Sequence, residues 1–248
     1  MDMSTKKFHG KKALVTGATS GIGRAIAVKL AQEGATVYVT GRRAELGKET
    51  VELIEQAGGT GHFVVADVGD LDDVRKLAQE VGDVDVLVNN AGIFPFSPTP
   101  EQSVEDYDRV FDVNVRGTYF LTAALAPAMV AKGKGVIVNV SSVAGQLGSP
   151  VGSVYHASKA AMDGLTRSWA SEFGGSGVRV NSVAPGPIRT DAAVTQAGEI
   201  FEQFANVVPL GRAGEPEEIA ETVVFVASDG AGFINGAVIN VDGGLVTV

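Results

Sequence analysis

The chain has 248 residues, a formal net charge of −9 and no cysteine. The length suits one large α/β domain, and the lack of cysteine excludes disulfides, thiolate catalysis and thiolate metal sites. No run of lysine and arginine extends beyond short pairs such as Lys11-Lys12, so we expect no binding to nucleic acid. No apolar run reaches the roughly 18–20 residues of a membrane span, and the first ten residues lack the apolar core of a signal peptide. We therefore expect a cytoplasmic protein that makes no membrane contact.

Short apolar or β-branched runs alternate along the chain with longer amphipathic stretches. The short runs predict seven strands, at 13–16, 36–40, 62–67, 84–89, 136–140, 178–183 and 237–241. Helices are predicted over 21–31, about 44–56, 72–81, about 103–132 with a bend near 114–117, and around Tyr155. This alternation predicts a single doubly wound Rossmann-type α/β domain over 1–248, with about seven parallel strands and helices on both faces. Segment 187–212 interrupts the rhythm and is predicted to be a substrate-loop insertion, because loops after strands build ligand sites.

The first strand is followed at once by the glycine-rich run Thr16-Gly17-Ala18-Thr19-Ser20-Gly21-Ile22-Gly23. Gly17 allows a tight strand-to-helix turn, Gly21 lets the backbone approach a pyrophosphate, and Gly23 lets the helix pack close to the sheet. A phosphate would then lie on the free N–H groups at the helix start. A plain loop before a helix is the alternative, but the position after the first strand favours a dinucleotide site.

The end of the second strand indicates which cofactor binds. A carboxylate at this position selects NAD, whereas a cation selects NADP. Here Gly41 stands where a carboxylate would be needed, and it is followed by Arg42 and Arg43. A guanidinium makes forked, charge-assisted contacts to a phosphate, so the pattern predicts NADP(H), with solvated arginines at a helix start as the alternative.

Tyr155 and Lys159 are four residues apart in a predicted helix, so their side chains leave the same face. A nearby ammonium favours the phenolate, so we expect Lys159 to lower the pKa of Tyr155 toward the range useful for acid–base work. Taken alone the pair is common in helices and carries little information.

Taken together, these motifs resemble those of the short-chain dehydrogenase/reductase family, over Lys12 to Gly244. The matching features are the glycine-rich run, Asn89-Asn90-Ala91-Gly92, Asn114, Ser142, Tyr155-His156-Ala157-Ser158-Lys159 and Pro185-Gly186. Each motif is short, but their joint order and spacing are specific to the family.

The resemblance implies four catalytic residues. Tyr155 would be the general acid in reduction and the base in oxidation, and Ser142, rather than Ser141, would bind the substrate carbonyl. Lys159 would bind the nicotinamide ribose and lower the pKa of Tyr155. Asn114 would bend its helix and hold a water that relays protons to Lys159.

The resemblance also implies the cofactor contacts and the assembly. Asn90, Ala91 and Gly92 would line the cofactor, with Asn89 more structural. The other implied contacts are Gly17, Thr19, Ser20, Gly21, Ile22 and Gly23 at the phosphates, Arg42 and Arg43 at the ribose, Asp67 and Val68 at adenine, and Pro185, Gly186, Ile188 and Thr190 around the nicotinamide. A homotetramer packed through the helices at 103–132 and 154–174 and the C-terminal strand is expected. No metal site is expected, since the histidines have no partners at metal-ligand spacing.

The substrate pocket is expected to be mostly apolar. Its predicted residues are Phe94, Phe96, Gln146, Leu147, Gly148 and Gly152, together with the insertion 187–212. Such walls favour a medium-sized apolar ketone or its alcohol. Our main interpretation is an NADP-dependent carbonyl reductase, working in reverse as an alcohol dehydrogenase, with a small-molecule ketone or alcohol as its partner.

Two alternatives remain. The first is a 3-oxoacyl-(acyl-carrier-protein) reductase, which needs a basic surface to dock its acidic carrier protein. The segment Glu172-Phe173-Gly174-Gly175-Ser176-Gly177 lacks the bases that such relatives commonly carry. The second is a non-catalytic NADPH-binding regulator. Such proteins usually lose the tyrosine or the lysine, whereas both are present here.

Overall fold

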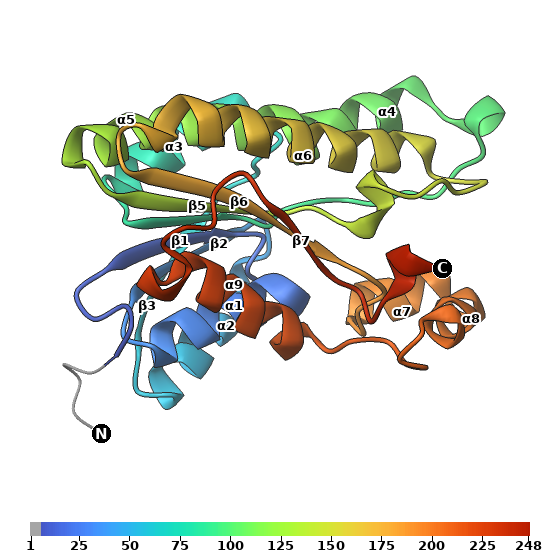
Figure 1. The fold of residues 1–248 in the computed structure, drawn as a ribbon, viewed down its shortest axis with the longest axis horizontal. Helices are drawn as coiled ribbons and strands as arrows, with labels where there is room; N and C mark the ends of the chain where they lie inside the picture. Colours follow the sequence, from blue (N-terminus) through green and yellow to red (C-terminus); the bar gives the residue numbers. More distant parts are fainter. Residues whose placement is uncertain (1–5) are drawn as a thin grey trace.

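A single parallel sheet forms the centre of the computed structural model, which describes residues 6–248 (Figure 1). Its strand order is β3-β2-β1-β4-β5-β6-β7. The strands are β1 Lys12–Thr16, β2 Thr36–Gly41, β3 Thr60–Val65, β4 Val86–Asn89, β5 Gly135–Val140, β6 Val178–Pro185 and β7 Val238–Val241. The chain winds outward from β1 to β3 and then, from β4, in the opposite direction. This order confirms the predicted doubly wound architecture and puts the topological switch point between β1 and β4.

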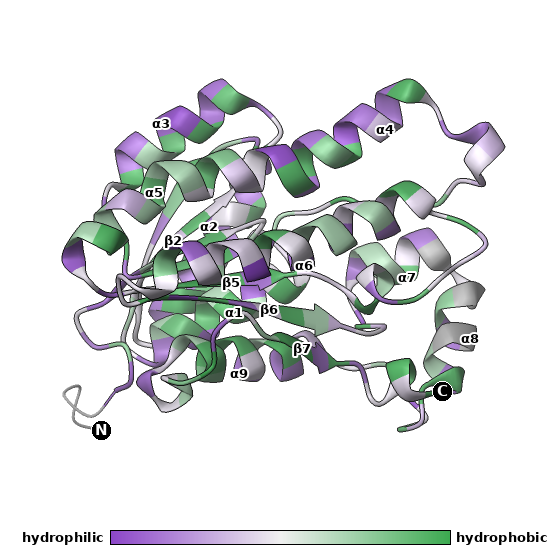
Figure 2. Cartoon of the chain, turned by 45° about the horizontal axis from the view of Figure 1, so that its top comes forward, coloured by the Kyte–Doolittle hydropathy of each residue, from purple (hydrophilic) through white to green (hydrophobic). Residues whose placement is uncertain are grey.

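Helices cover both faces of the sheet in Figure 1. One face carries α1 Gly21–Gln32, α2 Ala44–Gln56 and α9 Pro216–Ala227; the other carries α3 Leu71–Val81, α5 Thr118–Lys132 and α6 Ser153–Gly174. Strand β1 shows why both faces are apolar. Ala13 and Val15 pack into the cluster under α1 and α9, while Leu14 packs into the cluster under α5 and α6. Figure 2 shows the same pattern, with hydrophobic residues throughout the sheet and hydrophilic ones on the outer helix surfaces.

The long helix predicted over 103–132 is interrupted at the expected position. It consists of α4 Val104–Phe111, a π-helical turn Asp112–Gly117 and α5. A Cβ added to Gly117 would lie 1.7 Å from the carbonyl oxygen of Val68, so only glycine fits there. The widened turn therefore lies against the segment that follows β3.

Helix α9 has no counterpart among the helices predicted from sequence. Its run of β-branched residues, Thr222, Val223 and Val224, weakens the helical signal. The start signal was nevertheless present, since Pro216 stands at the first turn and Glu215 and Glu218 form a capping box.

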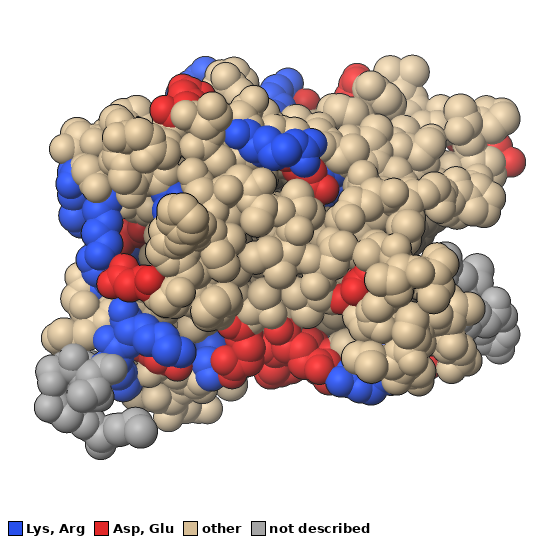
Figure 3. Space-filling model, in the orientation of Figure 1, with Lys and Arg blue, Asp and Glu red and all other residues tan. Residues whose placement is uncertain are grey.

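Segment 187–212 contains two short helices, α7 Asp191–Ala197 and α8 Glu199–Val207, which lie beside the C-terminal end of the chain in Figure 1. A parallel bridge between Ile188 and Gly214 closes the segment at its base. Acidic side chains gather over the neighbouring α9, whose first turn carries Glu217 and Glu218 (Figure 3). In the described part of the chain, no helix is both long and apolar enough to cross a membrane.

Candidate active site

The glycine-rich turn leaves the carboxyl end of β1 and leads into α1. Gly17 has φ 63°, and a Cβ on it would lie 2.7 Å from the Cα of Ala91. A Cβ on Gly23 would lie 2.4 Å from the carbonyl oxygen of Gly17 and 2.4 Å from Nδ2 of Asn90. Both glycines are therefore required by close backbone approach, which agrees with the roles assigned to them from sequence.

Asn90 fastens this turn to the end of β4. Its Nδ2 donates to the carbonyl oxygens of Thr16 at 2.9 Å and Gly17 at 3.2 Å. In return, Oγ1 of Thr16 accepts hydrogen bonds from the backbone N–H groups of Asn90 and Ala91, both at 3.0 Å. Asn89 is buried one residue earlier, where Nδ2 donates to Asn139 at 2.9 Å and Thr122 at 3.1 Å.

The start of α1 is suited to an anion. The side chain of its N-cap residue, Ser20, caps no backbone N–H group, and its first turn holds no acidic residue. The N–H groups of this turn and the positive end of the helix dipole are therefore available to a phosphate. Gly21 and Ile22 form the turn itself, and Thr190 packs over Gly21, whose added Cβ would lie 3.1 Å from Cγ2 of Thr190.

Two arginines hold the same turn from the side. Arg43 donates from Nη2 to Oγ of Ser20 at 2.7 Å and to Oγ1 of Thr19 at 3.1 Å. Arg24, which the sequence analysis missed, donates from Nη2 to the carbonyl oxygen of Thr19 at 2.7 Å. A Cβ on Gly41 would lie 2.7 Å from Cγ2 of Thr19, so no acidic side chain fits at that position without a shift.

Arg42 lies farther out, with Nη1 3.8 Å from a carboxylate oxygen of Asp67. Arg109 of α4 binds the same oxygen at 2.5 Å. Burial opposes ionisation of Asp67, but the hydrogen bonds from Arg109 and from the Gly69 N–H, together with the charges of both arginines, outweigh it. The pKa of Asp67 is consequently lowered. Arg109 had no distinguishing signal in the sequence.

Tyr155, Lys159 and Ser142 meet above the end of β5. The Nζ of Lys159 lies 5.7 Å from the ring centroid of Tyr155 and donates to the carbonyl oxygen of Val140 at 2.9 Å. Ser142 hydrogen-bonds Tyr155, and its Oγ also accepts from the Ala144 N–H at 3.2 Å.

The expected effect of Lys159 on Tyr155 is wrong for this geometry. Burial raises the pKa of Tyr155, and the hydrogen bond with Ser142 opposes that rise only in part. Burial also lowers the pKa of Lys159 to about 8, although the charge of Asp163 opposes this shift. The Nζ of Lys159 is directed at the Val140 carbonyl, and the cost of burying a charged group is the largest cause of both pKa shifts.

Asn114 lies in the π-helical turn and points toward the site. Its Nδ2 donates to the carbonyl oxygen of Ile93 at 2.9 Å and to Oγ of Ser158 at 3.0 Å, while its Oδ1 accepts from the Ile93 N–H at 2.9 Å. A Cβ added to Gly92 would lie 3.4 Å from Oδ1 of Asn114 and 3.5 Å from Nζ of Lys159. The structure thus brings these three predicted residues together.

The residues expected around the nicotinamide follow β6. Pro185 ends the strand, and a Cβ on Gly186 would lie 2.8 Å from the Cα of Asp242. Ile188 is buried at the base of segment 187–212. Oγ1 of Thr190 accepts the Ala193 N–H at 3.1 Å and so caps α7.

Three aromatic rings form one side of the predicted substrate pocket. The centroids of Phe94 and Phe96 lie 6.1 and 6.4 Å from that of Tyr155, and 6.1 Å from each other. Gly152 precedes the tyrosine helix with φ 76°, and a Cβ on it would lie 2.9 Å from Cδ1 of Phe96.

The other predicted pocket residues lie in the loop after β5. Gln146 and Asn240 of β7 bind each other through both amide groups, at 2.7 and 3.2 Å, and Gly148 is exposed. His156 has Nδ1 2.8 Å from the carbonyl oxygen of Leu147 and so holds this loop against α6.

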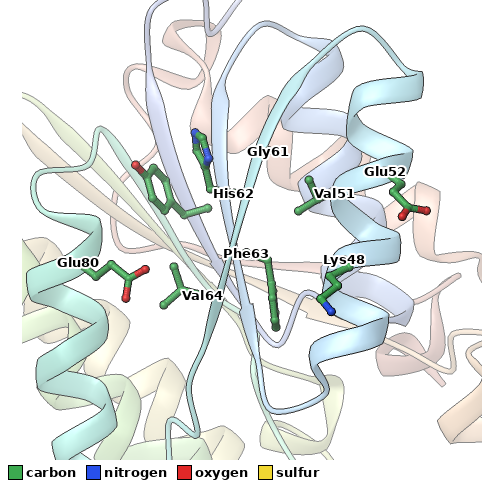
Figure 4. A pocket seen from close by; sticks show the side chains of 9 residues that line it. Lys48, Val51, Glu52, Gly61, His62, Phe63, Val64 and Glu80 are labelled. Carbon is green, nitrogen blue, oxygen red and sulfur yellow. The ribbon is translucent and has the colours of Figure 1, made fainter.

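A separate hollow of about 630 Å³ lies at the β3 edge of the sheet (Figure 4). His62 and Val64 point to one side of β3, whereas Phe63 points to the other, toward Lys48 of α2. The hollow thus follows the open sheet edge on both sides and gathers no set of converging polar groups. Among the side chains that the structure describes, no group of three histidine or acidic residues is arranged to bind a metal.

A dinucleotide-binding turn, a tyrosine with a lysine one helical turn away, and a serine within hydrogen-bond reach define a nicotinamide-dependent oxidoreductase of the tyrosine–lysine class. Comparison with known proteins agrees with this class. The sequence model of a family described as enoyl-(acyl carrier protein) reductase matches residues 17–246. A 3-oxoacyl-(acyl-carrier-protein) reductase from Thermotoga maritima is 42% identical over 97% of this chain and 99% of its own length.

Solved structures show the same relationship. One, described as a short chain dehydrogenase/reductase family protein, is 50% identical with a TM-score of 0.93, covering 98% of this chain and 100% of its own. Another, provisionally described as a 2-deoxy-d-gluconate 3-dehydrogenase from Agrobacterium tumefaciens with bound NADP, is 38% identical with a TM-score of 0.91 and 98% coverage of both chains. The chain belongs to the short-chain dehydrogenase/reductase family and is an oxidoreductase of that family.

Proposed function

We propose that the protein is an NADP(H)-dependent reductase of medium-sized, fairly apolar ketones, and that it also oxidises the corresponding secondary alcohols. The observation that supports this most directly is the convergence of Tyr155, Ser142 and Lys159 beneath the aromatic rings of Phe94 and Phe96.

The cofactor would supply a hydride to the carbonyl carbon, and the protein's own residues handle the charge that develops on oxygen. Ser142 and Tyr155 can each donate a hydrogen bond to that oxygen, and Tyr155 then delivers its proton. Because its pKa is raised by burial, Tyr155 remains protonated at neutral pH, the form that reduction requires. Lys159, anchored on the Val140 carbonyl, is placed to bind a ribose hydroxyl, and Asn114 lies beside it to support a proton relay.

Preference for NADP(H) is supported by the surroundings of the glycine-rich turn. Arg43 contacts both hydroxyl side chains of the turn, Arg42 extends into solvent nearby, and Gly41 leaves no room for a ribose-binding carboxylate. The solved relative with bound NADP gives independent support.

A 3-oxoacyl-(acyl-carrier-protein) reductase is the second candidate, because several relatives near 41–42% identity carry that description. Charge argues against it. Beside the substrate segment, Arg189 is paired with Glu202 and Arg212 with Glu218, so these cations are neutralised by acidic neighbours. An acidic carrier protein would also meet the acidic start of α9.

The test is turnover with NADPH of a free aryl or alkyl ketone against a carrier-bound β-ketoacyl thioester, using wild type and Tyr155→Phe. We expect the free ketone to be preferred and Tyr155→Phe to lose at least about 100-fold in kcat while still binding cofactor. Equal or better turnover of the carrier-bound thioester would transfer the proposal to the second candidate. Activity retained in Tyr155→Phe would contradict the catalytic assignment and favour the non-catalytic regulator.

Assembly as a homotetramer is supported by apolar surface on α4, α5 and α6. A hollow of about 520 Å³ there is lined by Phe111, Val115, Tyr119, Phe120, Ala161, Leu165 and their neighbours, and the side chains of Tyr119 and Phe120 are exposed. Burial of such a patch between subunits would stabilise the assembly. Sedimentation equilibrium should give four times the chain mass, and a monomer would contradict this assignment.

A further inference from the structure

Asp163 is a buried acid that the proposed reaction does not use. It lies on α6 one helical turn after Lys159, and only 4% of its surface is exposed. A carboxylate at this depth is costly unless it is hydrogen-bonded or paired, so its surroundings should show what compensates it.

Burial raises the pKa of Asp163, and two hydroxyl groups oppose that rise in part. Oγ of Ser182 lies 3.0 Å from Oδ1 of Asp163 and 2.8 Å from Oγ of Ser141, and Ser141 also hydrogen-bonds the carboxyl group. All three side chains are buried. The carboxyl group therefore links the end of β5 and the middle of β6 to helix α6.

The link acts on the residues that hold the catalytic groups. Ser141 stands between Val140, whose carbonyl oxygen accepts the hydrogen bond from Lys159, and Ser142, which hydrogen-bonds Tyr155. A displacement of Ser141 would thus move both the Val140 carbonyl that holds Lys159 and the Ser142 hydroxyl that binds Tyr155. Asp163 also lies one helical turn from Lys159, where its charge opposes part of the fall in the pKa of Lys159 that burial causes.

We infer that Asp163 is a positioning residue for the reaction: with Ser141 and Ser182 it fixes the end of β5, and it places a carboxyl group one helical turn from the buried ammonium of Lys159. The charged groups acting on Asp163 are Lys159 and Arg167, both on α6, and the groups facing it from β5 and β6 are the two uncharged hydroxyls. This inference rests on the proposed roles of Tyr155 and Lys159.

The experiment compares the pH profile of kcat/KM for ketone reduction in wild type, Asp163→Asn and Thr166→Val. Asp163→Asn keeps the shape and removes the charge. Thr166→Val removes a different buried hydrogen bond of the same helix, the one accepted from Asn139 at 2.8 Å. We expect the alkaline limb of Asp163→Asn to move to lower pH by about half a unit or more, since a nearby negative charge stabilises an ammonium. The alkaline limb of the kcat/KM profile of Thr166→Val should lie at the same pH as in wild type.

A uniform loss of activity in Asp163→Asn with an unchanged limb would overturn the inference, because a merely structural role predicts that result. If Asp163→Asn has too little activity for a profile, 13C NMR of the labelled lysine Cε gives the titration midpoint of Lys159 directly. A lower midpoint than in wild type supports the inference, and an equal one overturns it. Tyr155→Phe distinguishes a failure of the proposed function from a failure of the role inferred for Asp163. If Tyr155→Phe stays active, the proposed function is wrong, whatever the result for Asp163→Asn.

Discussion

The side chain of Asn90 donates a hydrogen bond to the carbonyl oxygen of Thr16 at 2.9 Å. In return, the side chain of Thr16 accepts hydrogen bonds from the backbone N–H groups of Asn90 and Ala91, both at 3.0 Å. The pair joins the carboxyl ends of β4 and β1 at the topological switch point, beside the turn that would hold the pyrophosphate. The cofactor site therefore depends on a contact between strands that are more than 70 residues apart in sequence.

Asn90→Ala should weaken both the fold and cofactor binding. It leaves the carbonyl oxygens of Thr16 and Gly17 without their side-chain donor, which costs about 1–3 kcal/mol when such groups are partly buried. Urea denaturation and cofactor titration by fluorescence measure the two effects. Thr16→Ser, which keeps the accepting hydroxyl, is the matched control. Wild-type cofactor affinity in Asn90→Ala would show that the turn holds its shape without this contact.

The two arginines after β2 should differ in how they select the cofactor. Arg42→Ala removes an exposed cation whose only ion pair, among the described side chains, is a long one to Asp67, at 3.8 Å, so NADPH affinity should fall by about 1.5–3 kcal/mol and NADH affinity much less. Arg43→Ala also frees the side chains of Ser20 and Thr19, so it should weaken binding of both cofactors. The dissociation constants of NADPH and NADH, measured for each variant, show whether the two arginines differ in this way. Equal losses for both cofactors in Arg42→Ala would mean that this residue does not read the 2′-phosphate.

The free energy of unfolding should depend on pH because of the buried Lys159. The pKa of Lys159 falls from 10.5 to about 8 on folding, so the charged form is disfavoured in the native state. The resulting penalty is fully present below pH 8 and is relieved as the pH rises toward 10.5, because the unfolded chain then binds the extra proton. Lys159→Met should therefore be more stable than wild type at pH 7, by up to ~3 kcal/mol, and the difference should shrink by pH 10. Denaturant unfolding at several pH values tests this, and a pH-independent difference would contradict it.

Gly152→Ala should disturb the aromatic side of the pocket. The positive φ of Gly152 disfavours any Cβ by about 1–2 kcal/mol, and the new methyl group would press on Phe96. We expect a lower Tm and a raised KM for bulky ketones. Gly148→Ala is the control in the same loop region, since nothing lies within 4 Å of its added Cβ. If both variants behave alike, Phe96 does not shape the pocket.

The sheet and the core of the site follow from local sequence, because strand periodicity and glycine-rich turns are signals carried by neighbouring residues. The residues that contact the site from other elements, and that set its charge and geometry, do not follow from local sequence. Arg24 and Arg109 look like ordinary surface arginines in sequence, and their contacts with Thr19 and Asp67 exist only once helices pack on the sheet. The pKa of Tyr155 was predicted in the wrong direction, because the helical spacing to Lys159 shows proximity but not the depth of burial. Asp163 did offer a signal, because it is an acid one helical turn from both Lys159 and Arg167 on the same helix face.

The bridge between Ile188 and Gly214 ties the two ends of segment 187–212, which we propose contacts the substrate, to one point of the fold. The Arg189 N–H donates to the carbonyl oxygen of Gly214 at 2.8 Å, and the Gly214 N–H donates to that of Pro187 at 2.9 Å. Because both ends of the segment meet at one point, the entropic cost of closing it as a loop depends only weakly on the number of residues in it. Specificity could therefore diversify by exchange of the residues between these two anchors, while the sheet, the cofactor turn and the proton-transfer residues stay as they are.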